Sequence, residues 1–552
     1  MKIRIVVAVL IVAAAATLAV ALQSPGKPAA PTKAGFEIVP LNPEVKAALK
    51  AQGKSLADVI PASANQGKKF NPTGELIAPL DTADKQNVLV LFVKFSDAPP
   101  GGPTERLDMS YFDDLLFGTV YDPPEYDAYP DAPTDRTLVN YFDEASLGKI
   151  DIATLNMPSD MGWMDTGKPY SYYCTADGVH DNGFGAYPNN VQGLVEDAVK
   201  LADPFVDFRT YAIDGQIPNL FVVFPGTGAE WSGDPSLIWS HSWDLTEEGG
   251  PGPYVADGVK INNYAMMPEV GGDLTGYAGP ADPVFPPTVG VFAHEYGHVL
   301  GLPDQYDYGY ESEGTGRYSL MAGGDWNRYP SDPIFYGNSP AQPDAWSKYR
   351  LGLIDPIMVA STTNVVIPPA EMDPIAYKMI VPGSGGKEYF LFENRQNVGF
   401  DQGLIYRTYA PDGSVTSATS LHGLAVYHVD DGIFTLDYWR PNEAENWKEW
   451  RSAGWREADN GANHYAIAIL QADDRWDLEH GVNVGDPGDL YPGSGNVTKV
   501  GNFTYPNTSS YYFWLGTLPK YGYSGVTASG IAEVGQDVTA TLSFQPIRSK
   551  KR

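Results

Sequence analysis

The sequence predicts an α+β fold followed by a β-rich, sandwich-like region. Continuous apolar runs at 87–97 and 219–226 indicate buried strands, and the i, i+3, i+4 apolar spacing of 191–204 is typical of an amphipathic helix. Beyond about residue 355, short strand-like runs alternate with Gly, Pro and Asp clusters, which indicates antiparallel strands. A chain of 552 residues is long enough for two or more hydrophobic cores.

The first 21 residues are expected to be a signal peptide. Lys2 and Arg4 precede an apolar run, and Ala19-Val20-Ala21 forms an A-x-A cleavage pattern. The alternative is an uncleaved membrane anchor, since the run approaches the length of a span. The small residues at its end favour cleavage after Ala21. We therefore expect a secreted, extracellular protein with no stable membrane insertion after cleavage.

Three further regions follow along the chain. Residues 22–83 are rich in Pro, Ala and Lys and precede the first strong strand, which indicates a propeptide or linker. The mixed region is expected to span 84–355. It includes a short helix and strand within 137–155 and a buried helix within 289–303 that ends at a glycine. The β-rich region is expected to cover 356–552.

Composition excludes some classes of function. The net charge of −31, from 68 acidic and 37 basic side chains, repels phosphate backbones and argues against nucleic acid as a partner. The single cysteine, Cys174, rules out an intramolecular disulfide. We expect a monomer that acts on proteins or peptides, for the reasons that follow.

The stretch HEYGH at 294–298 carries the most explicit chemistry. In a helix, residues i and i+4 lie on one face, so His294 and His298 can present both imidazoles to one ion. Glu295 is placed to act as general base toward a water that zinc activates, the chemistry of HExxH hydrolases. The alternative is a helix with two hydrogen-bonded core histidines. The pattern therefore predicts zinc-dependent attack of water on a carbonyl.

The third zinc ligand is less explicit in the sequence. Gly301 breaks the helix shortly after the second histidine and allows the chain to turn back, which brings Asp304 into position. Asp307 is the nearest rival. Glu311 or Glu313 would suit a glutamate ligand on a later helix, but their surroundings are rich in turn residues. Asp304 is the expected ligand, with an ordinary turn-capping role as its alternative.

A methionine turn is expected downstream. In RYSLMAGGDW, Met321 stands among small residues soon after the extended HExxH motif, the pattern of the metzincin Met-turn. Its soft apolar side chain would form the floor of the metal site, whereas alone it would be ordinary core. Tyr329, in NRYP, is a candidate donor to the reacting carbonyl oxygen in the transition state.

These motifs resemble the immune inhibitor A type of secreted bacterial metalloprotease, peptidase family M6. HEYGHVLGLPDQYD is similar to the metal motif of that family, and YSLMAGGDW looks like its Met-turn. Further similar blocks lie at 141–150, 220–243, 343–353, 388–401, 423–432 and 485–494. The resemblance therefore covers about residues 85–550.

The resemblance implies a secreted zinc endopeptidase made as a zymogen, with a metzincin-like catalytic domain followed by a β-rich domain. His294 and His298 would be zinc ligands, Glu295 the general base, and Asp304 the third ligand. The family often has an acidic residue directly after this aspartate, whereas Gln305 stands here. This departure either strengthens the assignment of Asp304 or weakens activity.

An acidic loop is a candidate calcium site. Flexible loops of Asp and Gly suit the oxygen coordination of Ca²⁺, although this spacing is not that of an EF-hand. Turn-forming aspartates in exposed loops are the alternative interpretation. The candidate ligands are Asp473, Asp474, Asp477, Asp486 and Asp489.

A group in the segment 22–83 is expected to block the metal site before activation. The segment has no cysteine, so a carboxylate such as Glu75 or Asp81 is the candidate group.

The alternative function is a non-catalytic pseudo-peptidase that binds protein or carbohydrate through its β-domain. Glu295 argues against this alternative, because structure alone would tolerate glutamine there.

Overall fold

The structure is a computed structural model that describes the main body of the chain. The described residues are 37–56, 59, 86–102, 107–129, 131–179, 181–246, 249–278, 284–331, 335–410, 415–434, 440–443, 465–511 and 522–545. The expected signal peptide at 1–21 lies outside them, as do Glu75 and Asp81. Among the described residues, no helix has both the length and the apolar character required to cross a membrane.

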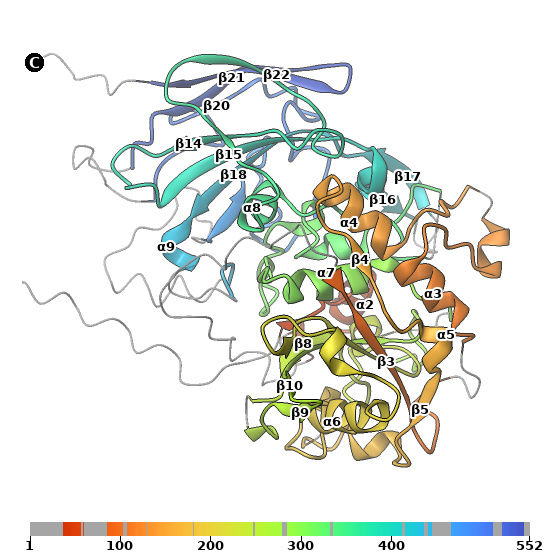
Figure 1. The fold of residues 1–552 in the computed structure, drawn as a ribbon. Helices are drawn as coiled ribbons and strands as arrows, with labels where there is room; N and C mark the ends of the chain where they lie inside the picture. Colours follow the sequence, from red (N-terminus) through yellow and green to blue (C-terminus); the bar gives the residue numbers. More distant parts are fainter. Residues whose placement is uncertain are drawn as a thin grey trace, which may run out of the picture.

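A six-stranded mixed sheet forms the lower part of the molecule in Figure 1. Its strands, in spatial order, are β1 (Glu37–Ile38), β8 (His241–Asp244), β11 (Asn263–Pro268), β7 (Leu220–Phe224), β3 (Leu89–Lys94) and β5 (Trp163–Asp165). The last four run parallel, whereas β8 is antiparallel to β11 and β1 is antiparallel to β8. The apolar runs predicted as buried strands are the central strands β3 and β7, buried along almost their whole length.

Helices cover both faces of this sheet. They are α3 (Ser110–Phe117), α4 (Leu138–Ser146), α5 (Pro158–Met161), α6 (Val191–Ala202) and α7 (Val289–Val299). Because successive strand residues point to opposite faces, Val90 and Phe92 of β3 share a core with α3, α4 and α7. Leu89 and Leu91 share a second core with α6 and with the early segment 38–59.

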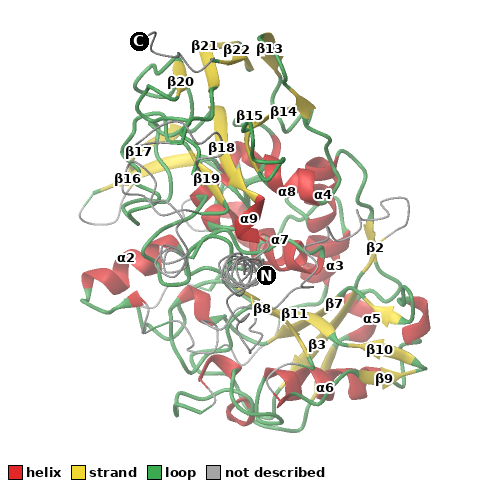
Figure 2. Cartoon of the chain, turned by 90° about the vertical axis from the view of Figure 1, so that its left-hand side faces the viewer, coloured by secondary structure: helices red, strands yellow, loops and turns green. Residues whose placement is uncertain are grey.

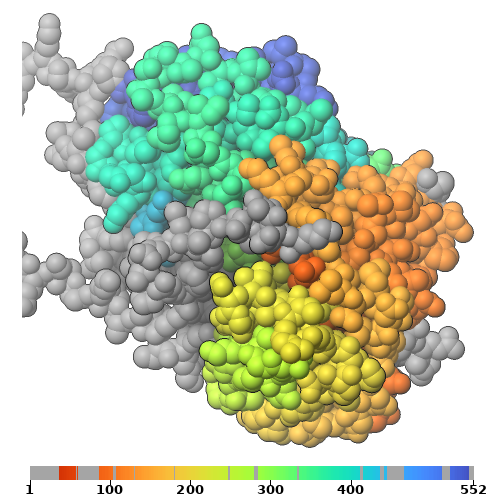
Figure 3. All heavy atoms as spheres, in the orientation of Figure 1, coloured from red at the N-terminus to blue at the C-terminus, as the bar shows by residue number. Residues whose placement is uncertain are grey.

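Two further sheets lie above helix α7 (Figures 1 and 2). The five-stranded sheet has the order β12 (Ile357–Met358), β14 (Ala376–Ile380), β15 (Glu388–Arg395), β18 (Gly423–Asp430) and β19 (Ile467–Ile469). The four-stranded sheet has the order β13 (Thr363–Ile367), β22 (Asp537–Phe544), β21 (Val526–Val534) and β20 (Lys499–Gly501). In Figure 3 these C-terminal residues, green to blue, form the upper part of the visible face.

Strand β15 connects the cores of the molecule. Phe390 and Phe392 point into the core between the two C-terminal sheets. Tyr389 and Leu391 point to the other face, into the same core as helix α7. The five-stranded sheet is therefore buried on both faces, and one of those faces packs against the helical layer.

Shorter elements complete the fold. These are α2 (Pro43–Ala51), α8 (Ala345–Arg350), α9 (Asp431–Phe434), β2 (Gln86–Asn87), β4 (Ile152–Ala153), β6 (Gln216–Ile217), β9 (Tyr254–Ala256), β10 (Val259–Ile261), β16 (Ile405–Tyr409) and β17 (Val415–Ser420). The mixed content of helices and many strands agrees with the predicted α+β class. The helix predicted at 191–204 is confirmed as α6, and Asn190 caps its N-terminus through the amide of Gly193.

Candidate metal centre

Helix α7 places two imidazoles side by side, with their ring planes nearly perpendicular. His294 and His298 are one turn apart and buried, and their Nε2 atoms lie 3.1 Å from each other. The Nδ1 atoms lie 2.9 and 2.8 Å from the carbonyl oxygens of Leu320 and Leu302. A carbonyl can only accept a hydrogen bond, so each Nδ1 carries the hydrogen and each Nε2 presents a lone pair.

Asp304 brings a third lone pair to the same point. Its Oδ1 lies 3.2 Å from Nε2 of His294 and 3.5 Å from Nε2 of His298. Tetrahedral zinc with bonds of about 2.0–2.1 Å places its ligand atoms roughly 3.3–3.4 Å apart. The observed separations match this spacing, so the donor set fits a zinc ion.

The electrostatics of the cluster also favour a bound cation. Burial alone would raise the pKa of Asp304, but the adjacent imidazoles lower it, so the carboxyl stays charged. Burial lowers the pKa of His298. Although burial opposes it, the contact with Asp304 raises the pKa of His294. A charged carboxylate buried beside the two rings therefore favours a cation at this site.

The rival carboxylates have other partners. Oδ1 of Asp307 accepts the backbone N–H of Gly309 and so caps a turn. Glu313 forms an ion pair with Lys46, and both side chains are almost fully buried. Within the described residues, the one group of three metal-binding side chains whose ligand atoms lie within 4.8 Å of one another is His294, His298 and Asp304.

The loop after α7 reaches this position by a glycine turn. Gly301 has a φ of 97°, a left-handed conformation that favours glycine. The chain then turns back, and the N–H of Gln305 donates to the carbonyl of Met321 at 2.7 Å. The side chain of Gln305 bridges Ser347 and Thr315. Gln305 therefore anchors the loop that carries Asp304.

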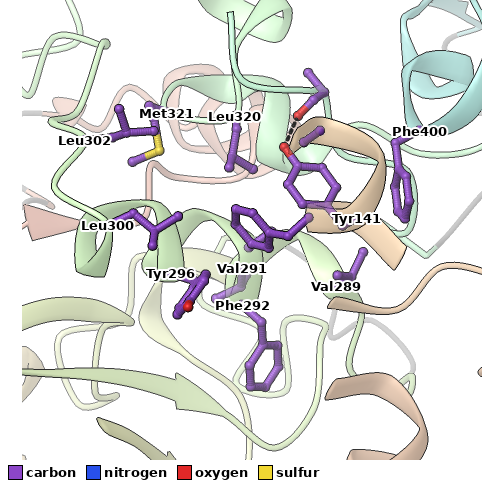
Figure 4. Close-up of a cluster of buried hydrophobic side chains, with 14 of the residues drawn as sticks. Tyr141, Val289, Val291, Phe292, Tyr296, Leu300, Leu302, Leu320, Met321 and Phe400 are labelled. Atoms are coloured by element: carbon purple, nitrogen blue, oxygen red, sulfur yellow. Dashed lines mark hydrogen bonds between the residues drawn. The ribbon is translucent and has the colours of Figure 1, made fainter. Parts of the chain in front are cut away.

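Met321 lies directly against helix α7, on the side shown in Figure 4 with Leu302 and Leu320. A Cβ at Gly297 would come within 2.5 Å of the Met321 sulfur, so the thioether packs on the helix between the two histidines. On the opposite side of the helix, Phe292 and Tyr296 pack on Phe221 of β7. The placement suits the expected floor of the metal site.

The two remaining predicted site residues, Glu295 and Tyr329, differ in how deeply they are buried. Glu295 follows His294 on α7 and is fully buried. Tyr329 is half-buried, with its backbone held by Asn338 and Arg407, and its role as a transition-state donor stays a prediction.

Sequence reasoning missed two groups near the cluster. The hydroxyl of Tyr308 lies 2.5 Å from Oδ2 of Asp304, and the spacing of four residues was the available signal. Asp325 is fully buried, and burial together with the charge of Asp304 raises its pKa well above the ordinary value. Asp325 lies within the GGDW end of the predicted Met-turn, which was its available signal.

The five candidate calcium residues accept hydrogen bonds, one of them from the Met-turn segment. Oδ2 of Asp489 accepts the hydroxyl of Tyr318 at 2.9 Å, and Asp486 accepts the N–H of Gly488 at 2.6 Å. Asp477 accepts from Asn483, Asp473 from the N–H of Arg475, and Asp474 from the indole of Trp476. In the described part of the chain these carboxylates form no group as compact as the histidine cluster. Calcium stays a prediction.

An early segment of the chain packs beside the metal centre. Strand β1 pairs with β8, with Ile38 opposite His241. The hydroxyls of Tyr306, Tyr308 and Tyr310 contact its backbone at Ile38 O, Ile38 N and Leu41 N, respectively. The indoles of Trp239 and Trp326 donate to the carbonyls of Val39 and Pro40 at 2.8 and 2.9 Å. Residues 37–41 therefore lie as an extended peptide beside the candidate metal ligands.

The chain is similar in sequence to known peptidases. A family model described as the catalytic domain of immune inhibitor A peptidase M6 matches residues 78–353. Immune inhibitor A of Bacillus thuringiensis subsp. alesti is 34% identical over 181 residues, 29% of this chain and 25% of that protein. Pre-pro-metalloprotease PrtV of Vibrio cholerae serotype O1 (strain M66-2) is 27% identical over 322 residues, 51% of this chain and 32% of that protein. The matched parts thus span between a quarter and a third of these relatives.

Proposed function

Because the chain belongs to the immune inhibitor A M6 peptidase family, we propose that it is a secreted zinc metalloendopeptidase that hydrolyses peptide bonds in proteins. The observation that carries the proposal is the convergence of His294, His298 and Asp304 on one point, in a region that also contains the buried Glu295. Three protein ligands, which leave the fourth position of a tetrahedral ion to water or substrate, are the donor set of a catalytic zinc rather than a structural one.

In the proposed mechanism, His294, His298 and Asp304 would hold a zinc ion, which would supply Lewis-acid chemistry: a lower pKa for a water molecule and polarisation of the scissile carbonyl. Glu295 takes the proton from the attacking water and delivers it to the leaving amine. The carbonyls of Leu320 and Leu302 hold the two imidazoles in the tautomer that presents Nε2. Asp304 supplies the negative charge that makes a dication favourable in a buried site.

The domain assignment is part of the proposal. We assign residues 1–21 to a signal peptide, 22–83 to a propeptide, 84–355 to a metzincin-like catalytic domain and 356–552 to a β-rich region. The antiparallel strand β8 beside parallel strands, together with Met321 beneath α7, supports the metzincin-like assignment. The two C-terminal sheets with a common core support the β-rich one. A structural calcium in the acidic loop remains part of this proposal.

The propeptide is proposed to keep the enzyme latent. The extended residues 37–41 and the ion pair between Lys46 and Glu313 support this role, because they hold the segment next to the metal centre. Glu37 is fully buried and its Oε2 lies 3.1 Å from the hydroxyl of Tyr308, which also contacts Asp304. Among the described acids of the segment, Glu37 is therefore the candidate latency group.

Latency is tested by N-terminal sequencing of the secreted, active form. We expect the active chain to start after residue 59, with the segment lost. An active chain that still begins at residue 22, with full activity, would contradict the latency role and leave the peptidase proposal intact.

The peptidase proposal is tested by casein hydrolysis with purified protein. We expect activity that a chelator abolishes and zinc restores, and that Glu295→Gln lowers by at least about a hundredfold while zinc still binds. Glu125→Gln, the same change at an exposed position, should leave activity unchanged. Activity that survives both the chelator and Glu295→Gln would rule out the mechanism. A zinc-loaded processed chain without activity would favour the pseudo-peptidase.

A further inference from the structure

Tyr308 stands in an unusual position between Asp304 and the early segment. Its side chain is fully buried, and its ring stacks on Tyr306 with the centroids 5.0 Å apart and the planes 11° from parallel. The guanidinium of Arg440 lies over the same Tyr308 ring, 4.1 Å from its centroid. These contacts fix the ring, so its hydroxyl has one defined location.

The hydroxyl makes contacts of two kinds. It lies 2.5 Å from Oδ2 of Asp304, and it also lies 3.2 Å from the N–H of Ile38 and 3.1 Å from Oε2 of Glu37. A phenol has one hydrogen to donate. Asp304 and Glu37 both offer carboxylate oxygens, but the contact to Asp304 is the shorter one, at 2.5 Å against 3.1 Å. The hydrogen therefore goes to Asp304, and the oxygen of Tyr308 accepts from Ile38.

This arrangement divides the two oxygens of Asp304. Oδ2 is held by Tyr308, while Oδ1 faces Nε2 of His294 and His298. A carboxylate with one oxygen already bonded cannot rotate freely or turn both oxygens toward a cation. The geometry favours one-oxygen coordination, which keeps the fourth position of a tetrahedral site open.

We propose that Tyr308 is a positioning residue of the metal centre: its hydroxyl holds Asp304 in the orientation in which Oδ1 alone meets the ion. This inference rests on the proposed zinc site. Partners that orient a metal ligand typically contribute a factor of about 10–100 to metal affinity. The two neighbouring tyrosines provide matched controls, because the Tyr306 hydroxyl donates to the carbonyl of Ile38 and the Tyr310 hydroxyl accepts the N–H of Leu41.

The test measures zinc affinity of the full chain by competition with a chromophoric chelator. Tyr308→Phe keeps the ring and removes the hydroxyl, and we expect it to weaken zinc binding by about 10–100-fold. Tyr306→Phe and Tyr310→Phe should stay within about twofold of the wild type. The visible spectrum of the cobalt-substituted protein should change in Tyr308→Phe alone, because the geometry of the Asp304 ligand changes. Near-UV circular dichroism checks that all three variants fold.

A double-mutant cycle separates positioning from a general structural effect. If Tyr308 acts through Asp304, Tyr308→Phe should have no further effect on zinc affinity in the Asp304→Ala background. Equal losses in both backgrounds would overturn the inference, as would an unchanged affinity in Tyr308→Phe. A wild-type chain that binds no zinc would overturn the proposed metal centre as well. Zinc binding without proteolysis would overturn only the peptidase activity.

Discussion

The contact between Gly297 and Met321 allows a quantitative test of the metal-site floor. Alanine at position 297 would place its Cβ 2.5 Å from the Met321 sulfur and 3.3 Å from its terminal methyl group. Ordinary contacts between such atoms begin at about 3.5 Å, so Met321 would have to retreat by roughly 1 Å. Overpacking of this kind typically costs about 1–3 kcal/mol. Alanine regains about 1 kcal/mol in helix propensity, so we expect a net loss of about 0–2 kcal/mol.

Gly297→Ala should also weaken zinc binding at the proposed metal centre. Leu320 precedes Met321, and its carbonyl accepts Nδ1–H of His294, while the Met321 carbonyl accepts the N–H of Gln305 beside Asp304. A retreat of Met321 therefore disturbs the partners of two proposed ligands. We expect zinc affinity to fall by about tenfold, the lower end of the range for lost orienting contacts.

Urea unfolding and chelator competition measure the two effects. Gly323→Ala is the matched control, because a Cβ there would meet nothing closer than 3.9 Å. Met321→Ala in the Gly297→Ala background should cost less than the two single changes added together, since the colliding atoms are gone. A Gly297→Ala chain as stable as the wild type with unchanged zinc affinity, or strict additivity in the double variant, would refute the reasoning.

Three further predictions follow from buried charges and from the metal. Lys46→Met leaves the carboxylate of Glu313 buried without its cation, so hydrogen exchange of the backbone amides at 38–49 should become faster. Lys50→Met, at an exposed position of the same helix, should leave their exchange unchanged. Removal of zinc by a chelator should lower the unfolding temperature of the wild type but not that of Asp304→Ala. Burial raises the pKa of Asp489 from 3.8 to about 7, so its folded form holds a proton that the unfolded form releases. In calcium-free buffer, stability should therefore fall as pH rises from about 4 to 7, by at most about 4 kcal/mol, and Asp489→Asn should flatten this dependence in urea titrations. An unchanged slope would contradict the prediction.

The parts of the site that depend on local spacing could be predicted from the sequence. The i, i+4 spacing of His294 and His298 places both imidazoles on one face of any helix, and a left-handed glycine at 301 turns the chain back within three residues of Asp304. The long apolar runs of β3 and β7 likewise specify central strands by themselves. In each case, the information lies within a few residues of the feature.

The parts that depend on distant contacts could not be predicted. Strand β1 has two residues, too few to give a periodic pattern, and its partners on β8 lie about 200 residues away. Tyr308 is one of 34 tyrosines, and only the folded loop shows which hydroxyl reaches Asp304. The aspartates at 473–489 have the composition of a calcium loop, yet their role as turn caps and as a partner of Tyr318 depends on tertiary packing.

Strand β15 contributes side chains to two cores, and this affects how the protein unfolds. Because Tyr389 and Leu391 complete the core around helix α7 while Phe390 and Phe392 complete the core between the C-terminal sheets, neither core is closed without this strand. The helical layer and the two sheets should thus melt together in one cooperative transition. A recombinant fragment that ends near residue 355 would expose an apolar surface next to helix α7 and should aggregate rather than behave as an independent enzyme.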